Sequence, residues 1–159
     1  MGFLVALVVV LLDQGSKYLV QMKLEVGMPI PVIPKFFYLT YIKNPGAAFG
    51  MLANRTQFFL FISLAVIVII AYYYRKVPKK WVLLRIGLGM QAGGAAGNMI
   101  DRLRFGTVVD FLDFHIWSYI FNIADAAITV GAAILALYLI KDSKKKEPAS
   151  SGESRQSEG

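Results

Sequence analysis

The chain has 159 residues, of which 57% are hydrophobic and 17% charged, and its mean hydropathy is +0.56. This composition excludes an ordinary soluble domain and predicts a membrane protein. The absence of cysteine and the presence of one histidine exclude a disulfide framework, a thiol nucleophile, an iron–sulfur cluster and a zinc site built on soft ligands. No cofactor and no metal are expected.

The net charge of +7 raises nucleic acid as a partner, so the placement of the lysines and arginines matters. They gather beside apolar stretches, chiefly at residues 75–80 and 141–146. Positive charge beside membrane spans is typical of cytoplasmic segments. We therefore expect no nucleic-acid binding, and we predict that both basic clusters and both termini are cytoplasmic.

Four apolar stretches are predicted to be transmembrane helices, at about residues 2–22, 57–74, 81–100 and 120–140. The first resembles a signal peptide in length, but it carries Asp13 and Lys17 where the apolar region of a signal peptide has no charge. We interpret it as a retained helix. The third is rich in glycine and alanine, which allow helices to pack closely.

Two segments are predicted to lie outside. Residues 36–42 are rich in aromatic and β-branched residues and predict a small extracytoplasmic β element within residues 23–55. Residues 101–119 are rich in aromatic residues and predict an interfacial cover at the level of the headgroups. The expected fold class is an all-α membrane protein, a four-helix bundle in one domain over residues 1–142, followed by a disordered cytoplasmic tail, 143–159.

Two acids near the outer ends of the predicted helices carry the chemical argument. A charge in the hydrocarbon region costs at least about 2.5–3.5 kcal/mol, so each acid needs a reason. Asp101 ends the third predicted helix and Asp125 lies near the start of the fourth, and consecutive antiparallel helices pack side by side. Two carboxyl groups that meet there would share one proton and supply an acid and a base together. Peptide hydrolysis at the membrane surface is therefore a candidate function.

Simpler explanations of these acids stay open. Asp101 can end its helix with Arg102 as its partner, and Asp125 can cap the start of the fourth helix. Each acid nevertheless follows an asparagine at a spacing of three residues, Asn98 and Asn122, which lets an amide on the same helical face orient it.

Three further polar residues, Asp110, Asp113 and His115, fall in the predicted interfacial cover. We expect the two aspartates to be solvated or helix-capping and the histidine to be structural. Three carboxylates without further ligands make a poor metal cage, so a metal site on Asp101, Asp110 and Asp125 is not predicted.

Two other classes of function compete with hydrolysis. A small proton-coupled transporter would use the intramembrane aspartates as a relay, and a noncatalytic scaffold would use the small-residue third helix to pack a partner. A transporter needs a polar path across the membrane, whereas the acids here lie near the outer ends and the inner halves of the predicted helices are apolar.

Five sequence blocks carry a family resemblance. They are DQGSK at 13–17, NPGAAFG at 44–50, GGAAGNMIDR at 93–102, VVDF at 108–111 and FNIAD at 121–125. In order and spacing they closely resemble the signature blocks of lipoprotein signal peptidase, also called signal peptidase II.

The resemblance implies a multi-pass aspartyl endopeptidase of a bacterial inner or plasma membrane. Such an enzyme removes the signal peptide from prolipoproteins and cuts just before a cysteine that carries a diacylglyceryl group. The resemblance places the catalytic dyad on Asp101 and Asp125, near the outer face of the membrane. The expected partners are lipidated prolipoproteins and membrane lipids, and a monomer is expected.

The remaining matched positions are expected to bind substrate or to support the dyad. They are Asp13, Lys17, Asn44, Gly46, Asn98, Arg102 and Asn122. Here too simpler readings stay open: an ion pair between Asp13 and Lys17 within one helix, a headgroup anchor at Arg102, and a turn or flexible loop at residues 44–50.

Overall fold

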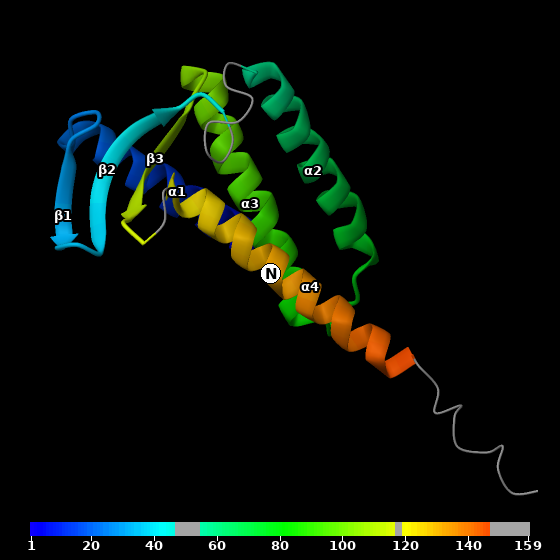
Figure 1. The fold of residues 1–159 in the computed structure, drawn as a ribbon. Helices are drawn as coiled ribbons and strands as arrows, with labels where there is room; N and C mark the ends of the chain where they lie inside the picture. The colour runs from blue at the N-terminus through cyan, green and yellow to red at the C-terminus, as the bar shows by residue number, and fades with distance from the viewer. Residues whose placement is uncertain (47–54, 117–118, 147–159) are drawn as a thin grey trace, which may run out of the picture.

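A computed structural model describes residues 1–46, 55–116 and 119–146 of the chain. These ranges contain four helices and four strands: α1 (Gly2–Lys23), β1 (Pro29–Ile33), β2 (Phe37–Asn44), α2 (Thr56–Lys76), α3 (Val82–Phe105), β3 (Val108–Phe114), β4 (Ile120–Phe121) and α4 (Ile123–Lys146). The helices form a bundle and the strands form a small sheet at one end of it (Figure 1).

Membrane-spanning length and composition are met by three helices of the described ranges: α1, α2 and residues Ile123–Lys141 of α4. Large apolar side chains such as Phe3, Phe61 and Leu137 remain exposed on these helices, as expected where lipid replaces water as the surroundings. Glycine and polar residues set α3 apart from the other three, and the predicted count of four spans stays a prediction.

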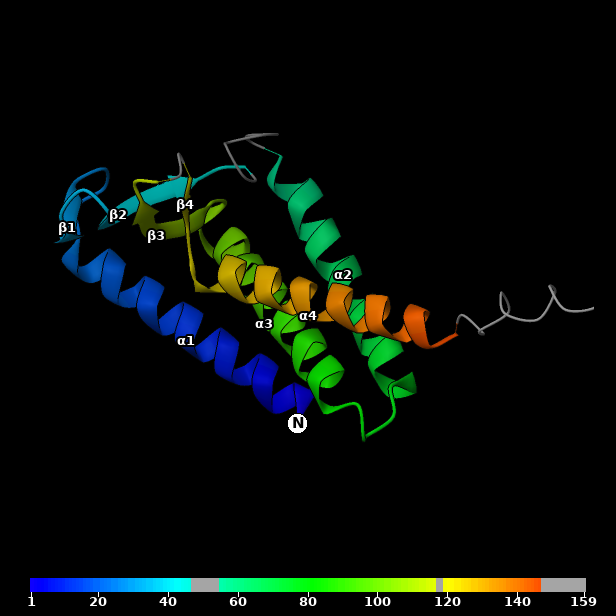
Figure 2. The same cartoon turned by 60° about the horizontal axis from the view of Figure 1, so that its bottom comes forward.

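Close contacts through glycine place α3 at the centre of the bundle (Figure 2). A side chain at Gly89 or Gly93 would strike the backbone of α1, and one at Gly94 would strike the carbonyl oxygen of Ala124 in α4. Glycine at these positions lets helix backbones approach closely, as the composition of this stretch predicts. The bundle therefore packs α1 and α4 on adjoining faces of α3, and Gly97 of α3 lies against both Asp13 of α1 and Ala124 at the start of α4.

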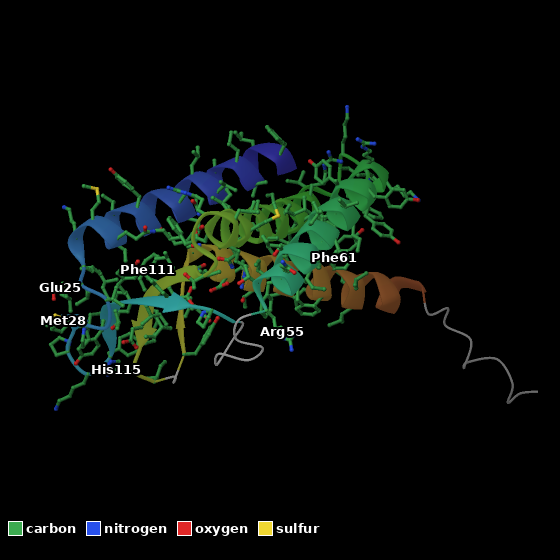
Figure 3. The ribbon with its side chains drawn as sticks, turned by 90° about the horizontal axis from the view of Figure 1, so that it is seen from above. Glu25, Met28, Arg55, Phe61, Phe111 and His115 are labelled. Atoms are coloured by element: carbon green, nitrogen blue, oxygen red, sulfur yellow. The ribbon has the colours of Figure 1, made fainter. Side chains whose placement is uncertain are left out.

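The sheet is antiparallel, with the strand order β1-β2-β3-β4. Its inner part packs on the C-terminal end of α1 through Val20, Tyr41, Val109 and Phe111. The other end of the sheet extends away from the helices, where Glu25, Met28 and His115 lie (Figure 3). The predicted β element at residues 36–42 is therefore one strand of a larger sheet.

The segment 101–119, predicted as an interfacial cover, contains the end of α3 and the strand β3, and its depth in the membrane stays a prediction. α3 continues to Phe105 and ends at Gly106, whose φ of 74° is in the left-handed region that favours glycine. The chain then enters β3, which pairs with β2. β3 was missed because its pairing partner lies more than sixty residues earlier in the chain, where local pattern gives no sign of it.

The helix boundaries differ from the predicted ranges mainly in α3 and α4. α1 and α2 lie within two residues of prediction, whereas α3 is longer and α4 begins at Ile123 rather than at residue 120. α4 also continues through Lys146, so the first residues of the predicted tail are helical. The tail from residue 147 onward lies outside the described residues.

Candidate active site

Asp125 lies in the first turn of α4 and forms a reciprocal cap with Asn122. The amide N–H of Asp125 donates to Asn122 Oδ1 at 2.9 Å, and Asp125 Oδ2 accepts from the amide of Asn122 at 3.3 Å. Asp13 of α1 accepts from the amide of Ala124 at 2.9 Å. The capping explanation of Asp125 is therefore correct. Asp125 Oδ1 takes no part in this cap and accepts from Asn98 Nδ2 at 2.7 Å.

Asp110 lies on β3 with only 1% of its side chain exposed, so the expectation that it is solvated or caps a helix is wrong. Asn44 Nδ2 donates to its Oδ2 at 2.8 Å, and Asn122 Nδ2 donates to its Oδ1 at 2.6 Å. Burial and the nearby charge of Asp125 outweigh these bonds and the charge of Lys17, and raise the pKa of Asp110 from 3.8 to about 7.

Asp110 and Asp125 line one pocket of about 150 Å³ where α2, α3 and α4 meet the sheet. Its lining comprises Asn44, Gly46, Phe59, Asn98, Arg102, Val108, Asp110, Tyr119 and Asp125. Four of the predicted supporting residues are among them, and they bring amides and a guanidinium to the two carboxyl groups. This donor set suits the carbonyl oxygens of a peptide in extended form.

Asp101 is not among the residues that line this pocket. Its carboxylate is 1% exposed and is held by three donors: Lys17 Nζ at 3.0 Å, Gln14 Nε2 at 2.9 Å and the amide of Val109 at 3.0 Å. The route of contacts from Asp101 to Asp125 passes through Lys17 and Asn98. The predicted pairing of Asp101 with Asp125 is thus indirect here.

Lys17 is a buried cation shared by three oxygen-bearing side chains. Its Nζ lies 2.8 Å from Asp13 Oδ2, 3.0 Å from Asp101 Oδ2 and 3.1 Å from Asn98 Oδ1. The predicted ion pair between Asp13 and Lys17 along one helix is present, and it extends to α3. With one ammonium group against two carboxylates, this cluster carries a formal charge of −1 behind the pocket.

Arg102 joins three segments around the pocket. Its Nη2 donates to the carbonyl oxygen of Gly46 at 3.0 Å, and its guanidinium lies 4.7 Å from the ring centroid of Phe59. These contacts set Arg102 in the pocket wall, with β2 and the start of α2 on either side. Asn44 also accepts from the amide of Gly46 at 2.9 Å, which is the local turn considered for this loop.

Sequence reasoning missed three residues of this region: Gln14, Asp110 and Tyr119. Gln14 and Asp110 both lie in sequence blocks that the resemblance had matched, so the blocks themselves carried the signal. Tyr119 lies just before β4, and burial together with the charges of Asp125 and Asp110 raises the pKa of its phenol, which therefore stays protonated. No local pattern singled it out.

Comparison with known proteins identifies the family. Residues 5–141 match the family model described as signal peptidase (SPase) II. The lipoprotein signal peptidase of Moorella thermoacetica is 51% identical over 137 residues, covering 86% of this chain and 91% of that protein. The lipoprotein signal peptidase of Pelotomaculum thermopropionicum is 50% identical over 143 residues, covering 90% and 93%.

Solved structures agree with these relatives. A bacterial membrane enzyme determined by the in meso method superposes with a TM-score of 0.87 at 34% identity, covering 92% of each chain. A second bacterial membrane enzyme superposes with a TM-score of 0.81 at 35% identity, covering 89% of this chain and 93% of that one. The transporter alternative gains no support from these matches. The chain belongs to the signal peptidase II family, the lipoprotein signal peptidases, and is a protease of a bacterial membrane.

Proposed function

We propose that this chain is an aspartyl endopeptidase that removes the signal peptide from prolipoproteins, cutting just before a diacylglyceryl-modified cysteine. The observation that carries the proposal is the pocket in which the carboxyl groups of Asp110 and Asp125 lie together with amide and guanidinium donors. The substrate class comes from the relatives, which are named lipoprotein signal peptidases.

The acid pair of this proposal is Asp110 with Asp125, in place of the predicted Asp101 with Asp125. Both members line the pocket, and the charge of Asp125 acts on Asp110. Asp101 has its oxygens engaged by Lys17, Gln14 and the amide of Val109, which leaves it poorly placed to activate water. Asp125 keeps the role that the sequence predicts for it.

The proposed mechanism uses one proton shared by the pair. Asp110 holds that proton near neutral pH, and its O–H polarises the carbonyl of the scissile bond. Asp125 accepts a proton from the attacking water as the new C–O bond forms. The resulting tetrahedral intermediate collapses when Asp125 gives this proton to the amine nitrogen and the C–N bond breaks, which leaves the pair with its one shared proton. Arg102 and Asn98 donate to substrate carbonyl oxygens at the pocket wall.

Asp13 and Asp101 act as positioning residues in this proposal. Asp101 accepts from the amide of Val109, directly before Asp110, and Asp13 accepts from the amide of Ala124, directly before Asp125. Each reactive acid is therefore fixed through its neighbouring peptide group, and Lys17 balances part of the charge of the two supporting carboxylates.

The proposed topology has four membrane spans, both termini in the cytoplasm, and the acid pair near the outer face. The basic residues 75–80 and the N-terminus lie at the end of the bundle opposite the sheet, which supports this orientation (Figure 2). The signal helix of the substrate enters from the bilayer, so its acyl chains stay in lipid while the cleavage site reaches the pocket.

The test is cleavage of a synthetic lipidated precursor peptide by purified variants. Asp110→Asn and Asp125→Asn are expected to lower kcat by about 10²–10⁴-fold, the usual worth of a general acid or base. Asp113→Asn is the matched control, because Asp113 lies on the same strand but contacts Thr40 and His115 instead of the pocket. It should keep kcat within about threefold of the original.

Asp101→Asn separates the two possible acid pairs. If Asp101 is a positioning residue, its variant loses thermal stability and retains measurable cleavage, whereas Asp110→Asn loses cleavage at unchanged stability or better. Equal activity of Asp110→Asn and the original would reject the pair proposed here. A precursor without the diacylglyceryl group should stay uncut, and its cleavage at the same rate would reject the proposed substrate class.

A further inference from the structure

A second cavity, of about 280 Å³, lies between α1, α2 and α3 at the end of the bundle opposite the sheet. Apolar side chains of all three helices line it, among them Phe3, Ile67, Ala71 and Leu88. Arg75, at the end of α2, is the one charged residue among its described lining. The cavity is therefore an apolar space with a cation at its mouth, on the side that the topology proposed above makes cytoplasmic.

Tyr74 forms a fixed wall at that mouth. The amide of Gly2 donates to Tyr74 Oη at 2.8 Å, and the guanidinium of Arg85 lies 4.0 Å from the centroid of its ring. Arg85 Nη1 in turn donates to the carbonyl oxygen of Val77 at 2.7 Å. A side chain at residue 2 would collide with the tyrosine ring, so glycine is needed for this contact. The mouth is thus a bonded structure that joins α1, α2 and α3.

Positive charge at the mouth lacks acidic partners within the described residues. The stretch 75–85 carries Arg75, Lys76, Lys79, Lys80 and Arg85 and no acid. None of the ion pairs found among the described residues involves these five cations. Lys76 contacts the phenol of Tyr72, and Arg85 contacts the uncharged partners given above. An anion that reached this mouth would meet several uncompensated charges.

We propose that this cavity binds one anionic phospholipid, with an acyl chain between the helices and the phosphate at Arg75. An acyl chain is the material that surrounds these helices, and one that lies in this apolar space makes dispersion contacts with all three of them. The chain gains little by moving from lipid to an apolar cavity, so selectivity comes from the headgroup. Basic pockets between helices on the cytoplasmic side recognise anionic headgroups in this way, and arginine binds phosphate through paired N–H groups.

The site is separate from the acid pair, since it lies at the other end of the bundle. Neither Arg75 nor any apolar residue named for the cavity lines the pocket of Asp110 and Asp125. The bound lipid is therefore distinct from the acyl chains of a lipidated substrate, and the inference does not depend on the proposed peptidase mechanism.

The experiment is native mass spectrometry of the purified full chain with phosphatidylglycerol or phosphatidylcholine that carry the same acyl chains. The original protein should bind phosphatidylglycerol about tenfold more tightly than phosphatidylcholine. Arg75→Gln removes the phosphate contact and Ala71→Trp fills the cavity, and each should weaken phosphatidylglycerol binding by about fivefold or more. Lys79→Gln removes the same charge from the same connection without touching the cavity, and should change binding less than about twofold.

Three results would overturn the inference. Equal binding of the two lipids would show that the headgroup is not recognised. An equal loss of binding in Lys79→Gln and Arg75→Gln would show only diffuse electrostatic attraction. Unchanged binding by Ala71→Trp would show that the acyl chain does not lie in the cavity. Thermal unfolding and precursor cleavage verify that each variant is folded. If Ala71→Trp fails to fold, Ala71→Leu reports on the same space with a smaller side chain.

Discussion

Lys17 is the shared partner of three side chains, because its ammonium group pairs with two buried carboxylates and donates to one amide oxygen. Replacing it with methionine keeps much of the volume of the side chain and leaves Asp13 and Asp101 without a cation. Breaking a buried ion pair from one side costs about 3–5 kcal/mol. We expect Lys17→Met to lower the free energy of unfolding in detergent by that order, measured by thermal or denaturant unfolding.

The matched control for this prediction is Lys23→Met. Lys23 lies in the last turn of the same helix and its side chain is exposed. A surface charge of this kind is worth about 0–1 kcal/mol. Indistinguishable unfolding of the two variants would show that Lys17 is not the charge partner that the geometry indicates.

Asp110 makes the stability of the fold depend on pH. Its pKa is raised from 3.8 to about 7 because the site is buried and lies close to the charge of Asp125. A pKa that is higher in the folded state means that the native protein holds the proton more tightly, so this stabilisation is full below about pH 4 and is lost as the pH rises through 7. The ionised form at higher pH is the less stable one.

Asp110→Asn should remove this dependence. Going from about pH 5 to pH 8, the stability of the asparagine variant relative to the original should rise by more than about 1 kcal/mol, as one unit of pKa shift corresponds to about that much. Thermal unfolding of both proteins at the two pH values gives the comparison. A constant difference across this range contradicts the assignment of the titration to Asp110.

At the level of elements, the sequence could predict what depends on neighbouring residues. The apolar runs of α1 and α2 are continuous, so their ranges were close to those found. The end of α3 could also be predicted from the sequence. Basic residues in the last turn and a glycine directly after it are ordinary signals of a helix end, and here they are Arg102, Arg104 and Gly106. These signals extend the helix past Asp101, which lies inside α3 rather than at the predicted helix end.

β3 could not be predicted in the same way. Residues 108–111 are buried on both faces, so the strand lacks the alternation of apolar and polar residues that marks a half-buried strand. Its place in the sheet depends on pairing with β2 and on contact with α1. Local pattern therefore predicts a solvated Asp110 and an acid pair between two helices, whereas the two acids that line the pocket lie on a strand and a helix.

The contact between α3 and α1 depends on the absence of a side chain at Gly97. A Cβ there would lie 2.5 Å from Asp13 Oδ2 and close to Ala124. Alanine normally stabilises a helix relative to glycine by about 0.5–1 kcal/mol, but crowding of a packed site costs about 1–3 kcal/mol. We expect Gly97→Ala to destabilise the protein and to slow precursor cleavage, since Asp13 caps the helix that carries Asp125.

Gly15→Ala is the natural comparison, because a Cβ at Gly15 meets no atom within 4 Å. This variant should unfold at the same temperature as the original or slightly higher. Similar behaviour of the two variants in unfolding and cleavage assays would mean that the close approach of α1 at Gly97 does not contribute to stability or activity.

On the scale of the whole molecule, the two ends of the bundle differ in charge and in structure. One end carries the sheet and the pocket of the acid pair, and the other carries the basic stretch 75–80 (Figures 1 and 2). The positive-inside tendency predicts that these ends lie on opposite sides of the membrane. The chain contains no cysteine, so a single introduced cysteine reports its own side without background.

We expect Glu25→Cys to react with a membrane-impermeant maleimide added outside intact cells, and Lys79→Cys to react only after the membrane is opened. Both native side chains are exposed, which makes them suitable for labelling. Quantification of labelled protein on a gel is the measurement. Labelling of both positions from one side would reject the predicted orientation.

The bond from the amide of Ala124 to Asp13 joins the first helix to the last across 111 positions of the chain. Because a ribosome releases the N-terminus first, α1 enters the bilayer long before the partner of Asp13 has been synthesised. A nascent chain that stalls before α4 contains Asp13 but neither Ala124 nor Asp125, so the proposed acid pair is completed only when synthesis reaches the last helix.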